Sequence, residues 1–305
     1  MLEVTELLAS ALRFATPLIF AALGGILCER AGVVNIGLEG LMLTGAFFGV
    51  LGAHLTGSAW AGLLLAVVAG VLLASLHAVA SIRFGAEQII SGTAVNLLAL
   101  GGTSYLLPQV FGSPGSSPQV TGFGSSPVPL LHDIPVLGPA LFGQQWFVWA
   151  GPLCALVIGW FLVRTVAGLR LRASGEAPRV LEAAGVRVLP LRYAAVAASG
   201  ALCGVAGAYL SLGLLSGFSA NMTAGRGFMA LAAVILGGWR PLRSMAAALF
   251  FGLAGALVIR LPQDAVDLQI LDMIPYVATI LVLVVFSRGV HGPAAVGRPY
   301  RPGAE

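Results

Sequence analysis

The chain has 305 residues, of which 58% are hydrophobic and only 9% are charged, and its mean hydropathy is +0.96. A soluble domain carries about a quarter charged residues, so this composition excludes a fully water-exposed surface, and it also excludes a disordered chain. The net charge of +4 comes from 16 arginines without any lysine, whereas a P-loop needs a lysine to reach the phosphates of ATP. The composition therefore predicts a membrane protein without a nucleotide-hydrolysing site of its own.

Windows of about 20 apolar residues are long enough to cross a bilayer as a helix. Two windows, 227–238 and 273–287, are short and favour half-helices or tilted helices. Residues 1–10 lack the basic segment of a cleaved signal peptide, so the first window is expected to remain as a membrane anchor. The even spread of windows predicts an all-α, polytopic transmembrane helix bundle of about 8–10 spans that forms one domain over residues 1–305. In chain order the windows are 7–27, 36–54, 60–80, 89–107, 146–166, 193–214, 227–238, 242–260 and 273–287.

The arginines orient these spans. If 164–192 lies in the cytoplasm, alternation of the spans places most of the 16 arginines on that side, while the predicted outer loops carry aspartates instead. This is the distribution that the positive-inside rule describes. It predicts an outside N-terminus and a cytoplasmic C-terminus, provided that the stretch 28–35 is not re-entrant.

Two of the segments that connect the predicted spans are long and differ in composition from each other. The outer segment 108–145 is rich in Pro, Gly and Ser, so it is expected to contain no helix and to act either as loose cover or as a docking surface for an external partner. The inner segment 168–192 contains a short amphipathic stretch between Pro178, which suits a first helical turn, and Gly185, which suits a helix end. This stretch predicts a short cytoplasmic helix that either lies on lipid or fits a groove on another protein.

Polar residues interrupt the apolar windows, where such side chains cost free energy unless they are paired or hydrated. The first cluster, 29–40, holds Asn35 and Glu39 among several glycines. This pattern predicts a broken helix whose exposed backbone lines a cavity, with a plain cytoplasmic turn as the alternative.

Two further polar clusters follow. Gln88 and Asn96 stand near the start of a span at helical spacing, which predicts either a polar seam or hydrogen bonds between helices. Phe218 and Asn221 fall in an outer loop, where an aromatic ring and an amide suit contact with a sugar or a base. An ordinary loop with an interfacial phenylalanine is the alternative reading.

No arrangement of residues suits hydrolysis, because the sequence contains neither a Gly-x-Ser-x-Gly elbow nor a His-Glu-x-x-His motif. Cys28, Cys154 and Cys203 lie in apolar stretches, and the four histidines lack metal-ligand spacing. The sequence therefore predicts no enzyme, no catalytic residue, no cofactor and no metal.

Four stretches, in their order and spacing, resemble the permeases of binding-protein-dependent ABC importers that serve ribose, branched-chain amino acids and nucleosides. The likeness is closest to the nucleoside or simple-sugar branch, in which Glu-Arg-x-Gly and then Asn-Ile-Gly-x-Glu-Gly stand near the N-terminus, as residues 29–32 and 35–40 do here. The chain departs from its relatives at 240–243, where Arg-Pro-Leu-Arg replaces the usual Asn-Pro and small residue. The four stretches are 22–47, 87–101, 171–188 and 225–242.

The resemblance implies partners that composition does not show. A second permease, similar or identical, would share the membrane; ATP-binding-cassette ATPase subunits would dock on the cytoplasmic face; and an extracellular solute-binding protein or lipoprotein would deliver the solute. The stretch near Asn35 would lie close to the translocation path. The inner segment would couple the permease to the ATPase through Arg172, Glu176, Arg179, Glu182 and Gly185.

Together these observations predict a multi-pass protein of the cell (inner) membrane that moves nucleosides or simple sugars by alternating access and binds no nucleic acid polymer. A branched-chain amino acid permease is one alternative, and an ion-driven secondary transporter with Glu39 as its titratable site is another. A scaffold that transports nothing would leave the polar clusters unexplained. The expected solute path consists of Asn35, Glu39, Gln88, Asn96, Phe218 and Asn221.

Overall fold

The computed structural model describes residues 2–124, 143–258 and 291–301, with 260, 277, 279, 280 and 284 as isolated positions. The predicted span 273–287 and the middle of the predicted loop 108–145 therefore lie mostly outside the described residues. Seven helical segments in the described part are long and apolar enough to cross a membrane, and one further apolar helix is shorter. The predicted all-α, polytopic membrane bundle is confirmed.

The helix bounds agree with the predicted windows to within a few residues. Short π-helical turns extend α3 over Val79–Arg83 and α8 over Tyr209–Leu215. The helices are α1 (Leu2–Arg30), α2 (Leu38–Thr56), α3 (Ala59–Ala78), α4 (Gln88–Phe111), α5 (Trp146–Arg164), α6 (Val166–Glu176), α7 (Pro178–Ala183), α8 (Val188–Ala208), α9 (Arg226–Leu236) and α10 (Pro241–Val258).

One predicted boundary is wrong, because α4 continues through Pro108 to Phe111 instead of ending before residue 108. A proline removes only one internal hydrogen bond, and here that loss falls in the last turn. Gly112 then ends the helix with φ +73° and donates its N–H to Pro108 O at 2.9 Å. The described part of the following loop is hydrogen-bonded to the chain that follows α8, for example through Ser117 N to Phe218 O at 2.8 Å.

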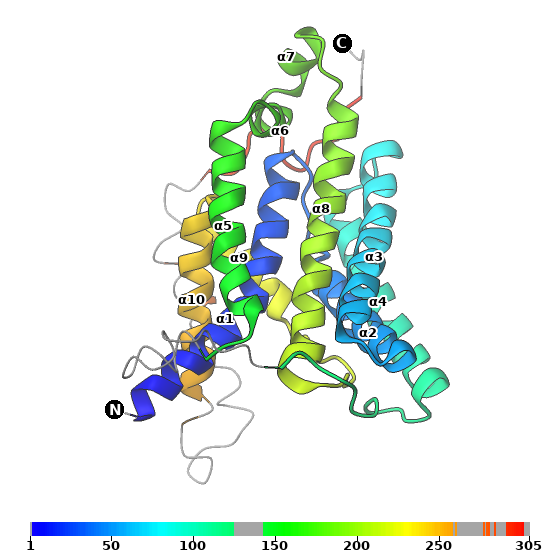
Figure 1. Cartoon of the computed structure of the whole chain (residues 1–305). Coiled ribbons are helices and arrows are strands. Elements are labelled where there is room, and N and C mark those ends of the chain that lie inside the picture. The colour runs from blue at the N-terminus through cyan, green and yellow to red at the C-terminus, as the bar shows by residue number, and fades with distance from the viewer. Residues whose placement is uncertain are drawn as a thin grey trace.

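The long helices run in alternating directions along one axis (Figure 1). The start of α1 lies at the end of the molecule opposite α7, and the segment 291–301 lies at the same end as α6 and α7. Helix α1 is bent, and it contains Pro17, which cannot donate a backbone hydrogen bond.

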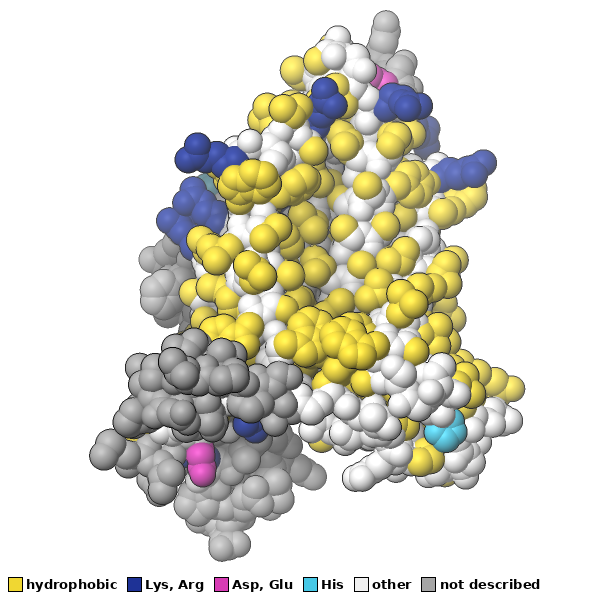
Figure 2. Space-filling model, viewed as in Figure 1, with side chains coloured by type: hydrophobic (Ala, Val, Ile, Leu, Met, Phe, Trp, Pro, Cys, Tyr) yellow, Lys and Arg dark blue, Asp and Glu magenta, His cyan; other side chains and the backbone are white. Residues whose placement is uncertain are grey.

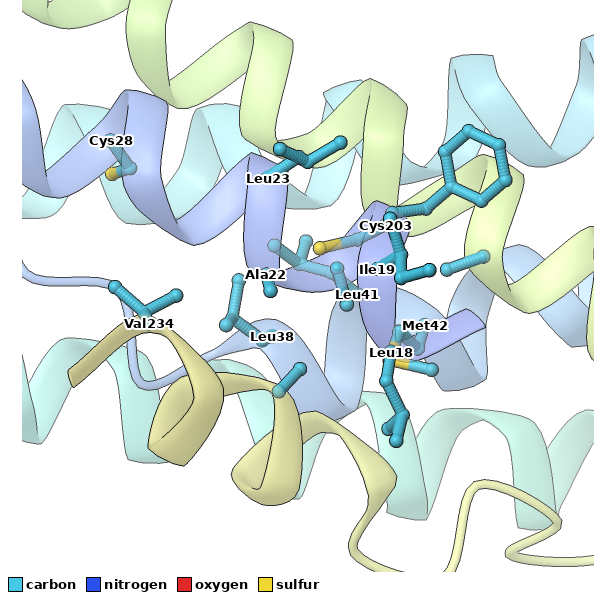
Figure 3. Packing of buried hydrophobic residues seen from close by; sticks show 14 of the residues in the cluster. Leu18, Ile19, Ala22, Leu23, Cys28, Leu38, Leu41, Met42, Cys203 and Val234 are labelled. Atoms are coloured by element: carbon cyan, nitrogen blue, oxygen red, sulfur yellow. The ribbon is translucent and has the colours of Figure 1, made fainter. Parts of the chain in front are cut away.

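Helices α2, α3 and α8 pack through glycines. A Cβ atom on Gly204 of α8 would stand 2.5 Å from Ala66 O of α3, and one on Gly207 would stand 2.0 Å from Met42 O of α2. Backbone therefore touches backbone in this group, as expected for small residues between membrane helices. Helix α1 covers the group with apolar side chains, and Figure 3 shows its Leu18 and Leu23 in the same cluster as residues of α2 and α8.

Two non-helical segments interrupt the bundle. The first, 31–37, separates α1 from α2, and the second, 216–225, separates the π-helical end of α8 from α9. Four residues of the second segment adopt positive φ: Ser216, Asn221, Ala224 and Gly225. The 11 residues of α9 rise only about 16 Å, roughly half the hydrocarbon thickness of a bilayer, so α9 is a half-helix.

Candidate functional site

The segment 31–37 is held by polar side chains from α3 and α4. Val34 N donates to Gln88 Oε1 at 2.6 Å, and His77 Nε2 donates to Val34 O at 2.9 Å. His77 Nδ1 lies 3.0 Å from Ser91 Oγ on α4. Because both backbone groups of Val34 are paired, an extended stretch of chain is tolerated inside the bundle.

Two asparagines fix the end of the same segment and the start of α2. Asn35 donates through Nδ2 to Ser199 Oγ of α8 at 3.0 Å and accepts from Gly37 N at 3.0 Å. Asn96 accepts from Gly40 N at 2.8 Å and donates to Ile36 O at 3.0 Å. The side chain of Asn96 thus supplies, from another helix, the acceptor that a helix start needs for a free N–H group.

Glu39 connects α2 to the segment 216–225 and to the start of α9. Its Oε1 accepts from Gly225 N at 2.7 Å and its Oε2 accepts from Gly227 N at 2.6 Å, so the carboxylate caps the N-terminus of α9. The position suits a negative charge, because free N–H groups and the helix dipole both give that end of a helix a partial positive charge. A Cβ on Gly227 would stand 2.4 Å from Glu39 Cα, so the start of α9 lies against the start of α2.

The structure therefore brings four of the six predicted path residues into one cluster, which we call the polar junction: Asn35, Glu39, Gln88 and Asn96. Asn35 and Gln88 are each 1% exposed and Glu39 is 9% exposed, and the hydrogen bonds described for them engage protein groups. The segment 31–37 is non-helical, as both predicted alternatives require, and it connects two spans, α1 and α2, that run in opposite directions. In this structure the hydrogen bonds of the four side chains hold backbone groups of the segment 31–37, of α2 and of the start of α9 in place.

The other two predicted path residues lie outside the polar junction. Phe218 is buried and packs edge-to-face on Phe47, with ring centroids 5.2 Å apart. Asn221 is exposed and adopts φ +54° in the segment that leads to α9.

Sequence reasoning missed His77 and Ser199, which complete the polar junction. His77 is 1% exposed and lies in a mostly apolar window. A polar side chain in a membrane span is a functional candidate, which is the argument that identified Asn96, so His77 could have been found in the same way. Ser199 gave no signal, because a serine beside a glycine is common on any closely packed membrane helix.

The predicted short helix of the inner segment is present as α7, which begins at Pro178, and Gly185 follows it with φ +80°. Glu176 forms an ion pair with Arg30, with 3.7 Å between Oε1 and Nη1, and its other carboxylate oxygen accepts from Ala294 N at 3.1 Å. Glu176 therefore connects α6 to α1 and to the segment 291–301.

The tip of α7 is exposed, including Arg179, Glu182 and Val180, the last of which is 70% exposed. Tyr300 donates its hydroxyl to the Glu182 carboxylate, and desolvation together with this bond raises the pKa of Tyr300 to about 12. Like any phenol of ordinary or raised pKa, Tyr300 is protonated at neutral pH and is a donor to α7.

Arg192 of α8 anchors the segment 291–301. The side chain is 2% exposed, donates to Ser174 O at 3.3 Å and to Arg298 O at 3.2 Å, and lies 5.6 Å from the centre of the Tyr300 ring. A buried guanidinium thus connects α6, α8 and this segment.

A family model for the permease component of branched-chain amino acid transport systems matches residues 7–286. The chain belongs to this permease family. The permease is 39% identical over 302 residues to the guanosine ABC transporter permease protein NupQ of Bacillus subtilis, covering 95% of this chain and 94% of NupQ. It is also 39% identical over 305 residues to the nucleoside ABC transporter permease protein NupC of Lactococcus lactis, covering 96% of each.

The fold of the permease matches a solved inward-facing structure of an ABC transporter of the metal-chelate type, with a TM-score of 0.50. At 17% identity, over 92% of the permease and 84% of that chain, this likeness concerns the fold alone. Family membership and the seven apolar helices make the permease a multi-pass membrane protein.

Proposed function

We propose that the permease is the membrane-spanning subunit of an ABC importer for nucleosides, with simple sugars as the related substrate class. The observation that carries this proposal is the 39% identity, over nearly the full length, to two permeases named for guanosine and for nucleoside transport. A nucleoside contains a sugar, so the two substrate classes share hydroxyl groups that a polar path can recognise.

The electrostatics of the polar junction support an uncharged solute. The helix starts of α2 and α9 meet there, and their free N–H groups are taken up by the Asn96 amide and the Glu39 carboxylate. Among the described hydrogen bonds of the polar junction, none involves an Arg side chain. The Glu39 carboxylate already occupies the start of α9, so the carboxylate of a branched-chain amino acid would meet a like charge there, whereas a nucleoside or a sugar would not.

The solute path in this proposal follows the two broken segments, 31–37 and 216–225, with Asn221 and Phe218 near its outer end. The side chains of the polar junction hold the backbone that borders the path, and alternating access would exchange some of their hydrogen bonds for bonds to solute. Broken helices that meet in mid-membrane are where transporters commonly bind their substrates.

Energy in this proposal comes from separate ATP-binding-cassette ATPase subunits at the end of the molecule that carries α7 and the C-terminal segment, which would be cytoplasmic. The exposed α7 tip with Arg179, Val180 and Glu182 would contact the ATPase, while Arg172, Glu176 and Gly185 shape its base. A second permease and an extracellular solute-binding protein would complete the importer, as the family predicts.

The test is uptake of radiolabelled guanosine, ribose and leucine by the native host, by a strain deleted for the permease, and by that strain carrying the gene again. We expect deletion to abolish guanosine uptake and the restored gene to recover it. Uptake should stop on ATP depletion and survive an ionophore that leaves ATP intact. Loss of leucine uptake alone would reassign the permease to amino acids, and uptake sensitive only to the ionophore would indicate a secondary transporter.

A further inference from the structure

A groove of about 740 Å³ opens between the ends of α5, α6 and α10, where four arginines line it together with apolar residues. Arg30 and Arg172 come from α1 and α6, Arg240 directly precedes α10, and Arg243 lies in the first turn of α10. We call this feature the arginine groove. It belongs to neither the polar junction nor the tip of α7.

The arginine groove carries more positive charge than its described surroundings neutralise. Arg30 is paired with Glu176. Glu29, the residue before Arg30, accepts a hydrogen bond from Trp239 Nε1 at 2.5 Å and forms no ion pair with the arginines of the groove among the described residues. Arg172, Arg240 and Arg243 form no ion pair within the described residues.

Arg172 gives the sharpest indication of a ligand. Its Nε atom is buried and has no hydrogen-bond partner in the part of the chain that the structure describes. A buried charged donor without an acceptor costs free energy, and an anion in the groove would supply that acceptor. Helix α10 starts in the groove at Pro241, so its partial positive charge adds to the attraction.

The other wall of the arginine groove is apolar and faces outward. Val163 is 66% exposed and Leu242 is 47% exposed, and Gly159 of α5 lies beside Pro241 in the same lining. Figure 2 shows arginine side chains at the shoulder over the ends of α5 and α10, directly above a broad apolar surface. Helices α6 and α7 extend beyond this level, so the shoulder lies where a bilayer surface would meet the bundle (Figure 1).

We propose that the arginine groove binds an anionic phospholipid, with the phosphate among Arg172, Arg240 and Arg243 and an acyl chain along Val163 and Leu242. A free phosphate would satisfy the guanidinium groups but would leave the apolar wall uncovered. Basic pockets between helices at the cytoplasmic boundary suit such headgroups, because the positive charge and the apolar wall each match one part of the lipid.

The test uses the full-length permease, purified in a neutral detergent and titrated with phosphatidylglycerol or phosphatidylcholine of identical acyl chains, with native mass spectrometry to count bound lipid. We expect phosphatidylglycerol to bind at least tenfold more tightly. Because one arginine near an anionic lipid surface contributes about fivefold in affinity, Arg243→Gln should weaken binding about fivefold and the triple change of Arg172, Arg240 and Arg243 to Gln about 100-fold. Arg243 is exposed, so its single change keeps the test valid even if the triple variant does not fold.

Arg83→Gln and Arg187→Gln are the matched controls, because both arginines are exposed and lie outside the groove. Their lipid binding should stay unchanged. Equal binding of the two lipids would overturn the proposal, as would inorganic phosphate displacing phosphatidylglycerol at equal concentration. A triple variant that keeps its lipid preference but loses co-purifying ATPase would assign the groove to a protein interface instead. Lipid binding is measured without solute, so its failure would leave the proposed transport function untouched.

Discussion

Asn96 offers the most direct test of the polar junction. Asn96→Leu keeps the number and branching of the side-chain heavy atoms and removes two hydrogen bonds, those with Gly40 N at 2.8 Å and Ile36 O at 3.0 Å. A typical intramolecular hydrogen bond contributes about 0.5–1.5 kcal/mol, so the pair contributes about 2 kcal/mol. For a chain of this size such a loss lowers the thermal midpoint by about 4 °C.

The loss should affect transport more than folding, because Asn96 holds both the last part of the segment 31–37 and the start of α2. We expect Asn96→Leu to express normally, to unfold a few degrees earlier in detergent, and to take up guanosine several-fold more slowly. Thr93→Val is the control, since Thr93 lies on the same helix, is exposed, and bonds only its own backbone at Ile89 O. An Asn96→Leu protein with wild-type midpoint and uptake would refute this reasoning.

Three further predictions concern the cap of α9, the glycine packing of α8 and the ion pair of α6. Glu39→Gln should lower the thermal midpoint and uptake together, because each hydrogen bond to a charged group contributes about 1.5–3 kcal/mol. A glutamine amide presents only one acceptor to the two N–H donors of α9. An unchanged midpoint would show that Glu39 does not stabilise the start of α9. Gly204→Val should reduce the yield of folded protein in fluorescence-detected size-exclusion chromatography, because its Cβ meets Ala66 O at 2.5 Å, whereas Gly101→Val, with nothing within 4 Å, should not. Glu176→Arg should raise the number of ATP molecules hydrolysed per solute transported by the reconstituted importer, and an unaltered ratio would separate this residue from coupling.

The sequence was most informative where a local pattern determines local structure. Pro178 and Gly185 delimited α7 correctly, because each residue favours one end of a helix through its own backbone. The polar cluster at 29–40 correctly marked a non-helical break in the apolar sequence, since charged and amide groups rarely occur in a continuous membrane span.

Pairings between distant residues could not be predicted. Glu39 meets Gly225 across 186 positions, and Asn35 meets Ser199 across 164. Nothing near Arg192 indicated that it would bind Arg298 O, because a basic residue at a helix start usually faces water or lipid headgroups. The residue type of Glu39 identified it as a candidate, whereas its hydrogen bonds to the start of α9 could not be predicted, and its place along the solute path stays a prediction.

The glycine contacts among α2, α3 and α8 bear on how the permease moves. Side chains can change rotamer to accommodate sliding helices, but backbone atoms in direct contact have no such freedom. The three helices should therefore behave as one rigid body, and rearrangement should occur at its borders with α1 and α9, which in turn pack on α5 and α10. Spin labels on α2 and α8 would then keep one separation throughout the transport cycle, while a pair on α5 and α8 would report two.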